Sequence, residues 1–181
     1  NIDQSLKADP NFALGHAYKA YVGVLGTEAN DATQSRKIFE TYISTANLTN
    51  LLGRECLHLE AAQILLEGDF LAAGKLLDKI SKEYPRDLLA LSVGHQIDFF
   101  TGNATMLLSR IKSALPAWTP EDKYYSTMLG MLSFGLEEAG QYERAEQAGL
   151  EAVERNSKDV WAIHAVTHTY EMQAQFYKGM R

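Results

Sequence analysis

The sequence predicts an all-α fold, a right-handed α-α superhelix in which antiparallel helix hairpins stack as a solenoid. Three observations predict it: glycines at a regular spacing, turns at about twice that spacing, and small residues where paired helices would cross. The β-branched alternation that strands need is absent from the sequence. Because one hairpin cannot bury its apolar stripe alone, the hairpins are expected to stabilise one another by stacking.

Three segments share one pattern, in which a helical run is followed by a glycine and a second helical run. They are LLEGDFLAAGKLL, FFTGNATMLLSRI and LEEAGQYERAEQA, with glycines at Gly68, Gly102 and Gly140. The glycines are 34 and 38 residues apart, at or near the period of the tetratricopeptide repeat (TPR). A helix ends well where glycine takes the left-handed conformation, so each glycine is expected to end the first helix of a hairpin.

The second helix of a hairpin is expected to end at a turn, near Pro10, Pro85 and Ser157. These turns are 75 and 72 residues apart, which is about two repeat periods with small insertions. Proline supports this placement because it cannot continue a helix but can start the next element. Alanine at a crossing lets two helices approach closely. The residues at that place are Ala32, Ala73 and Ala145, with Leu107 in the middle repeat.

The expected elements follow from these markers. Residues 1–9 finish a second helix, and the later helices run over about 11–26, 30–47, 51–67, 69–84, 87–101, 103–115, 121–139 and 141–156, with a last one from near 158. Pro116 and Pro120 bracket a longer link that contains Trp118. Asp69 and Asn103, just after their glycines, are expected to cap the helices that follow.

All residues from 1 to 181 are assigned to a single TPR-like solenoid of about four repeats. It is expected to be incomplete at both ends and to belong to a longer protein. The segment WAIHAVTHTYEM near the C-terminus is too apolar for the polar capping face of a terminal repeat. Either more chain follows it or another copy of the protein covers it.

The composition of the chain argues against several classes of function. The chain has 181 residues, 23 acidic against 17 basic side chains and a formal net charge of −6. It has no long Lys/Arg run, which argues against nucleic-acid and membrane-surface partners. No stretch approaches the roughly 20 apolar residues of a membrane span, and no signal-peptide pattern opens the chain. One cysteine, Cys56, excludes an intrachain disulfide and fits a reducing compartment, so a cytoplasmic protein is expected.

The segment DVWAIHAVTHTYEMQ (159–173) closely resembles the core motif of the tetratricopeptide repeat protein 38 family, also described as StaR-like. The stretches RECLHLEAAQILLEGDFLAA, YPRDLLAL and MLSFGLEEAGQYERAE look like neighbouring segments of that family, from about Gly53 onward. The resemblance implies a TPR fold and a longer parent chain. It implies no reaction, since the family has no established biochemical activity; a role in glycopeptide-antibiotic biosynthesis has been suggested for a relative.

In this architecture the first helix of each hairpin lines the concave face. His164, His168 and Glu171 share one helix face by their spacing. His58 takes the equivalent place two hairpins earlier, and His95 lies near the same level but closer to the packing side. For each histidine the alternative is a buried side chain that hydrogen-bonds to neighbouring helices. The predicted groove consists of Tyr21, His58, His95, Phe99, Phe134, Trp161, His164, His168 and Glu171.

A protein- or peptide-binding scaffold with this histidine- and aromatic-lined groove is the favoured function, with self-association as a further possibility. No cofactor is expected. The cationic clamp with which some TPR domains hold a terminal carboxylate is absent from the matching positions, so a neutral or basic segment, or a small polar molecule, suits the groove better. Cys56 and His58 lie two apart on a helix and do not face each other, which leaves nucleophilic catalysis without support.

The alternative function is a metal-binding or enzymatic protein that uses His164, His168 and Glu171. Two histidines four residues apart can reach one ion, and a carboxylate one turn further on can complete three ligands. However, the segment HAVTHTYE lacks the glutamate next to the first histidine that marks zinc hydrolases. An enzyme is therefore the less favoured class.

Overall fold

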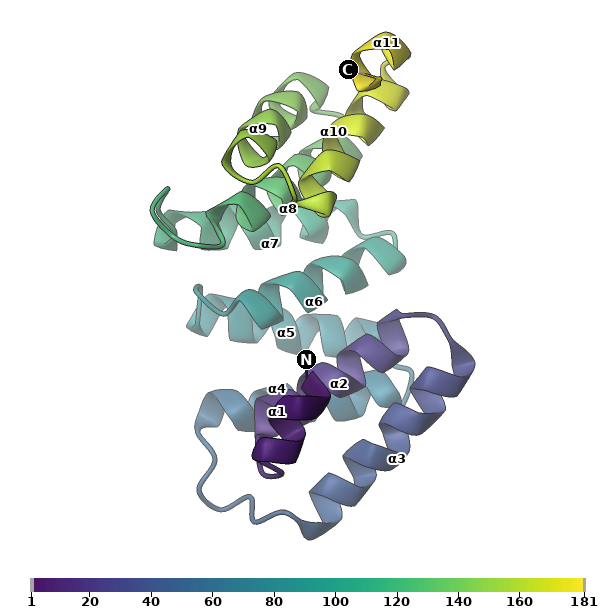
Figure 1. Cartoon of the computed structure of the whole chain (residues 1–181), viewed down its shortest axis with the longest axis vertical. Coiled ribbons are helices and arrows are strands. Elements are labelled where there is room, and N and C mark those ends of the chain that lie inside the picture. Colours follow the sequence, from purple (N-terminus) through teal and green to yellow (C-terminus); the bar gives the residue numbers. More distant parts are fainter. Residues whose placement is uncertain (1, 181) are drawn as a thin grey trace. The chain divides into compact units, whose positions relative to one another are not determined.

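The computed structural model describes residues 2–180, and these residues form helices without any strand. The predicted all-α fold is confirmed (Figure 1). The elements are α1 (Ile2–Ala8), α2 (Ala13–Leu25), α3 (Ala29–Thr45), α4 (Gly53–Leu66), α5 (Phe70–Glu83), α6 (Leu88–Phe100), α7 (Ala104–Ala114), the 3-10 turn η1 (Leu115–Ala117), α8 (Tyr125–Glu138), α9 (Tyr142–Arg155), α10 (Val160–Met172) and α11 (Phe176–Gly179).

The turns within the repeats have the predicted chemistry. Gly68, Gly102 and Gly140 adopt positive φ angles of 94°, 67° and 71°, as the left-handed end of a helix requires. Asp69 accepts a hydrogen bond from the backbone N–H of Ala72 at 2.9 Å, and Asn103 accepts one from Met106 at 3.1 Å. Both predicted N-caps are therefore confirmed.

The helices form two compact units, Asn1–Ile97 and Asp98–Arg181, with the boundary inside α6. In the first, here called unit 1, α2 packs against α3 and α4, and α4 packs against α5. The core of unit 1 is continuous, and its fully buried large side chains include Tyr21, Phe39, Leu65, Leu77 and Ile80. Ala73, expected at a helix crossing, is fully buried there.

In the second unit, here called unit 2, α8 is the central helix. It packs against α7, α9 and α10, and α10 also packs against α9. Ala145 is fully buried on α9, as its predicted place at a crossing requires. The prediction of one continuous solenoid stays a prediction, and each unit is described by itself.

Helices α7 and α8 approach each other closely. A Cβ added to Gly135 on α8 would lie 2.9 Å from the Cα of Leu108 on α7. The absence of a side chain at Gly135 therefore allows this close approach. Leu107 itself is buried at 1% exposure.

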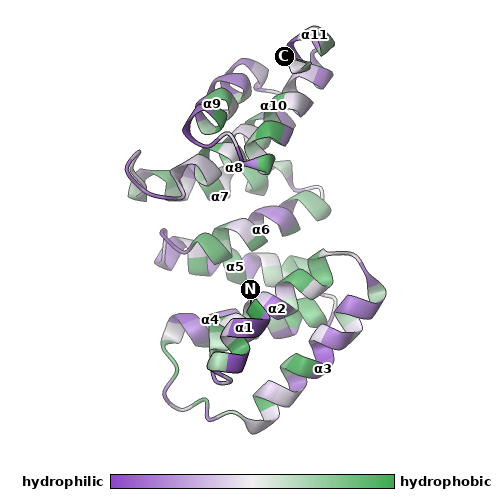
Figure 2. Cartoon of the chain, viewed as in Figure 1, coloured by the Kyte–Doolittle hydropathy of each residue, from purple (hydrophilic) through white to green (hydrophobic). Residues whose placement is uncertain are grey.

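No helix within the described residues is long and apolar enough to cross a membrane. Figure 2 shows why: hydrophobic and hydrophilic residues are interspersed at short intervals along the helices. This pattern is the one expected of helices that bury one face and expose the other.

The left-handed turns generate a stability prediction. Replacing Gly68 by Ala should lower the free energy of unfolding by about 1–2 kcal/mol, because a Cβ is strained in the left-handed region. Space is not the cause, since an added Cβ at Gly68 meets no atom within 4 Å. Urea denaturation followed by circular dichroism measures the effect.

Gly53→Ala is the matched control. An added Cβ at Gly53 also meets open space, but this glycine lies in the first turn of α4 at an ordinary φ. Alanine there should leave stability unchanged or raise it by up to about 1 kcal/mol. Equal effects at the two positions would contradict a conformational origin.

Candidate functional site

A row of ring contacts runs across unit 2. The ring centroids of Phe100 and Phe99 are 5.9 Å apart, and those of Phe99 and Phe134 are 5.3 Å apart. His164 continues the row at 5.8 Å from Phe134, and Trp161 follows at 5.7 Å from His164. Centroid separations in this range are those of favourable aromatic pairs. Together with His168, these side chains define what is called the aromatic face below.

The aromatic face has one buried ring and several exposed ones. Phe134 on α8 is only 5% exposed and contacts both histidines of α10. Phe99, Phe100 and Trp161 are 45%, 43% and 57% exposed. Apolar rings that are fixed on one side and open on the other are typical of recognition surfaces when they gather in one place.

His164 and His168 are neighbours on α10, as their spacing predicts. Their rings stack with centroids 5.6 Å apart and an interplanar angle of 22°. His164 is exposed, and His168 is partly buried because it lies against the end of α8. Glu171, one turn further along α10, is exposed.

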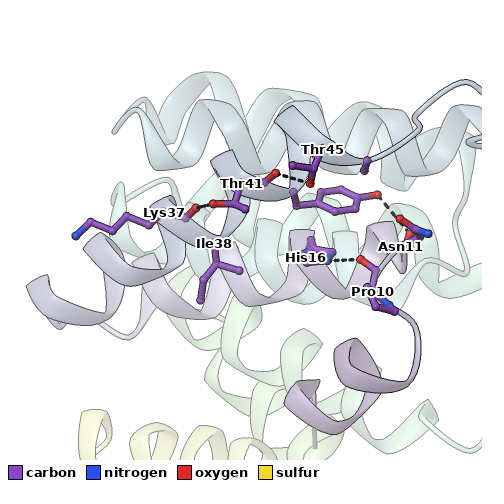
Figure 3. Close-up of a pocket in the computed structure, with 9 residues that line it drawn as sticks. Pro10, Asn11, His16, Lys37, Ile38, Thr41 and Thr45 are labelled. Carbon is purple, nitrogen blue, oxygen red and sulfur yellow. Dashed lines mark hydrogen bonds between the residues drawn. The ribbon is translucent and has the colours of Figure 1, made fainter.

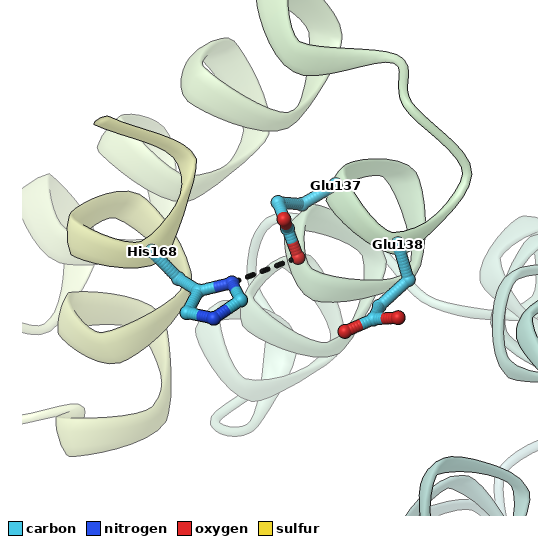
Figure 4. Close-up of side chains that lie close together, drawn as sticks. All are labelled: Glu137, Glu138 and His168. Carbon is cyan, nitrogen blue, oxygen red and sulfur yellow. Dashed lines mark ion pairs between the residues drawn. The ribbon is translucent and has the colours of Figure 1, made fainter. Parts of the chain in front are cut away.

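Two glutamates at the end of α8 lie at the edge of the aromatic face (Figure 4). Glu137 is 3% exposed, and its Oε2 lies 3.1 Å from Nδ1 of His168. Burial raises the pKa of the Glu137 carboxyl; the charge of Glu138 adds to this effect, whereas His168 opposes it. Ligand atoms of Glu137, Glu138 and His168 all lie within 4.8 Å of one another.

This group differs from the predicted metal candidates. It keeps His168 but replaces His164 and Glu171 by the two glutamates of a neighbouring helix. Within residues 2–180 it is the one group of at least three acidic, histidine or cysteine side chains with this proximity.

Tyr21 and His58, which the sequence places in the groove, lie in the core of unit 1. Both are 0% exposed. The Tyr21 hydroxyl donates to the backbone carbonyl of His58 at 2.8 Å and lies 3.1 Å from its Nδ1. Burial, with a smaller contribution from the charge of Asp87, raises the pKa of Tyr21, which keeps the hydroxyl protonated as a donor. These two side chains are therefore not part of the surface proposed below.

Asp87 completes this buried network. Its Oδ2 accepts hydrogen bonds from His58 Nε2 and Arg54 Nη1, each at 3.0 Å, and its Oδ1 accepts one from the backbone N–H of Ala90. Burial alone would raise the pKa of Asp87, but the hydrogen bonds and charges of these partners outweigh it and hold the pKa below its usual value. Asp87 thus caps α6 and joins it to α4.

The remaining predicted residues divide between the units. His95 on α6 is 8% exposed and belongs to unit 1, as do Tyr21 and His58. The members in unit 2 are Phe99, Phe134, Trp161, His164, His168 and Glu171. Only this second group contributes to the aromatic face or to its edge.

Unit 1 also has an open pocket of about 380 Å³ between the α1–α2 turn and α3 (Figure 3). The His16 ring stacks on Tyr42 at 3.9 Å, and His16 Nε2 donates to the carbonyl of Pro10 at 2.9 Å. These contacts tie the turn to the hairpin, so a structural role accounts for both side chains. The lining residues are Pro10, Asn11, His16, Lys37, Ile38, Thr41, Tyr42, Thr45 and Ala46.

Sequence reasoning missed two features. The predicted groove does not include Glu137 and Glu138, and Asp87 was not singled out. A comparison of equivalent positions in the repeats could have found Asp87. Asp159 lies 72 residues later and caps α10 in the same way, by accepting a hydrogen bond from Ala162 N–H at 3.1 Å. For Glu137 and Glu138 no such signal exists, because residue spacing within α8 does not predict a contact with His168 on α10.

The helix pairs, their left-handed glycine turns and their spacing define a TPR-like helical-repeat protein. No family model matches the chain. A solved structure described as "MamA RS-1 ArsTM double mutant" is similar with a TM-score of 0.57 and 13% identity, over 91% of this chain and 89% of that chain. Another, "MamA MSR-1 C2", has a TM-score of 0.53 and 14% identity, over 91% and 90%. MamA is TPR-like, and these likenesses show the fold.

The network around Asp87 generates a second prediction. Asp87→Asn keeps an oxygen that can cap α6 but removes the charge that His58 and Arg54 contact. We expect the free energy of unfolding to fall by about 2–4 kcal/mol, because buried hydrogen bonds to a charged acceptor are lost. Asp78→Asn, which breaks the exposed pair with Lys82, should change it by less than about 0.5 kcal/mol. Urea denaturation of both variants measures the two changes in the free energy of unfolding.

The same network predicts a pH dependence. Since the pKa of folded Asp87 is lowered, its contribution to stability is present above the unfolded pKa and is lost as pH falls through the folded pKa. The difference in unfolding free energy between the wild type and Asp87→Asn should therefore shrink below about pH 4. Denaturation curves at a series of pH values measure it; a constant difference down to about pH 3 would contradict it.

Proposed function

We propose that the chain is a protein-interaction scaffold that binds a basic, partly apolar protein segment on the aromatic face of unit 2. The observation that carries the proposal is the row of ring contacts from Phe100 to Trp161, in which one ring is buried and three phenylalanine or tryptophan rings remain exposed. Exposed aromatic rings held in place by a buried neighbour supply contact area at low entropic cost, as hot spots of interfaces do.

Charge supports a basic partner. Glu138 and Glu171 are exposed beside the aromatic face, and within residues 2–180 neither forms an ion pair with a lysine or arginine. The chain as a whole carries a net charge of −6. One lysine or arginine of the partner can contact one of these carboxylates, and another can lie over the Trp161 ring. An acidic segment would meet repulsion at the same place.

The fold adds support of a general kind, because helical-repeat proteins use the surfaces of their stacked helices for binding. Membership of the tetratricopeptide repeat protein 38 family is part of the proposal. Its support is the resemblance of the segment 159–173, which covers all of α10 and therefore Trp161, His164 and His168. No reaction is proposed from this resemblance.

Selection from a random peptide library displayed on phage tests the proposal. Selected peptides should be enriched in Lys and Arg together with Leu, Ile or aromatic residues. Binding of a selected synthetic peptide should weaken about tenfold or more in Trp161→Ala and in Phe99→Ala, since each change removes an exposed ring of the face. The dissociation constants can be measured by fluorescence anisotropy of the labelled peptide.

Tyr124→Ala is the control, because Tyr124 is 46% exposed in unit 2 but makes none of the ring contacts of the aromatic face. It should leave the dissociation constant within about twofold. Selection of acidic peptides, or equal losses in Tyr124→Ala and Trp161→Ala, would overturn the proposal. Concentration-dependent dimerisation that Trp161→Ala abolishes, without peptide binding, would assign the face to a second copy of the chain instead.

A further inference from the structure

The buried carboxylate of Glu137 lacks a full compensating charge. It is 3% exposed at the end of α8, and its ion-pair partner in the described chain is the partly buried His168. Burying a carboxylate is costly unless positive charge or several hydrogen bonds compensate for it. The last turn of α8 contains no basic residue, and the backbone carbonyls at the C-terminal end of a helix also favour a cation.

The contact between Glu137 and His168 has the separation but not the alignment of a hydrogen bond. Oε2 and Nδ1 lie 3.1 Å apart, yet neither atom has a hydrogen-bond partner of good geometry, and both are buried. An ion bonded to both atoms at about 2.1 Å would lie off the line that joins them, with an angle of roughly 95° at the metal. An imidazole nitrogen whose contact with the carboxylate oxygen does not meet hydrogen-bond geometry fits such an ion better than a direct hydrogen bond.

Glu138 can provide a third ligand. The carboxylate of Glu138 has an oxygen within 4.8 Å of the other two ligand atoms, and Figure 4 shows both glutamates beside the His168 ring. Glu138 is exposed, so a side-chain rotation can close the remaining distance. Two carboxylates and one imidazole leave a fourth, open position for water or a partner's side chain.

We propose that Glu137, Glu138 and His168 form a binding site for a divalent transition-metal ion, with Zn²⁺ as the probe ion. Imidazole favours ions of this class, whereas Mg²⁺ and Ca²⁺ prefer all-oxygen sites. The site joins the end of α8 to α10. It does not depend on the proposed binding of a protein segment, and it uses ligands from two helices rather than the His164, His168 and Glu171 set expected from the sequence.

Zinc titration of the purified chain tests the site, in a Cys56→Ser background because an exposed thiol such as that of Cys56 is itself able to bind zinc. Isothermal titration calorimetry should show one Zn²⁺ per chain and no binding of Mg²⁺ at the same concentration. His168→Ala and Glu138→Gln should each weaken zinc binding about tenfold or more, whereas His164→Ala should stay within about threefold.

These variants separate the proposal from its rivals. His164 lies one turn from His168 on the same helix, so it is the matched control for a non-specific histidine effect. Glu138 is exposed, and its replacement should leave the circular dichroism spectrum unchanged, which keeps the test independent of folding. In addition, the side-chain nitrogen resonances of His168, but not those of buried His58, should shift on zinc addition.

Two results would overturn the proposal. One is the absence of stoichiometric zinc binding by the folded chain. The other is a loss in His164→Ala equal to that in His168→Ala, with Glu138→Gln unaffected, which would assign the ion to the histidine pair of α10. Failure of peptide binding to the aromatic face would leave the zinc result standing, because the two experiments share no readout.

Discussion

Close packing of paired helices is the constraint on which the rest of this structure depends. Close packing needs a tight reversal of the chain, which three of the turns achieve with a left-handed glycine, and small or absent side chains where the helices meet. Gly68, Gly102 and Gly140 meet the first need, and Ala73, Ala145 and Gly135 meet the second. The packing of α8 against α10 determines which of their side chains are in contact. The aromatic face is a consequence of this packing.

The two units use histidine in different ways. In unit 1, His58 is fully buried, and its ring and backbone contact Asp87 and Tyr21 within a network that also caps α6. That network has its polar groups satisfied, so structure accounts for it. In unit 2, His168 lies half-buried against a carboxylate with which it does not align. Incomplete satisfaction of a buried polar group is what distinguishes a candidate ligand site from a structural one.

The aromatic face and the glutamate–histidine cluster are adjacent because α8 contributes to both. Phe134 and Glu137 lie on consecutive turns of α8, one under the stacked histidines and the other beside His168. A ligand on the exposed rings would therefore lie near the acidic edge. This proximity links apolar contact with electrostatic selection of the partner, two contributions that interfaces commonly combine.

The sequence by itself determined the fold class, the helix limits to within a few residues, the glycine turns and the caps at Asp69 and Asn103, because these depend on local conformation and short-range hydrogen bonds. It also predicted that His164 and His168 are neighbours, because residues four apart on one helix lie on the same face. Only the tertiary structure decided that Tyr21 and His58 are buried and that Glu137 and Glu138 meet His168. Those outcomes depend on how helices far apart in the sequence pack against one another, and no periodicity within a single helix encodes that contact.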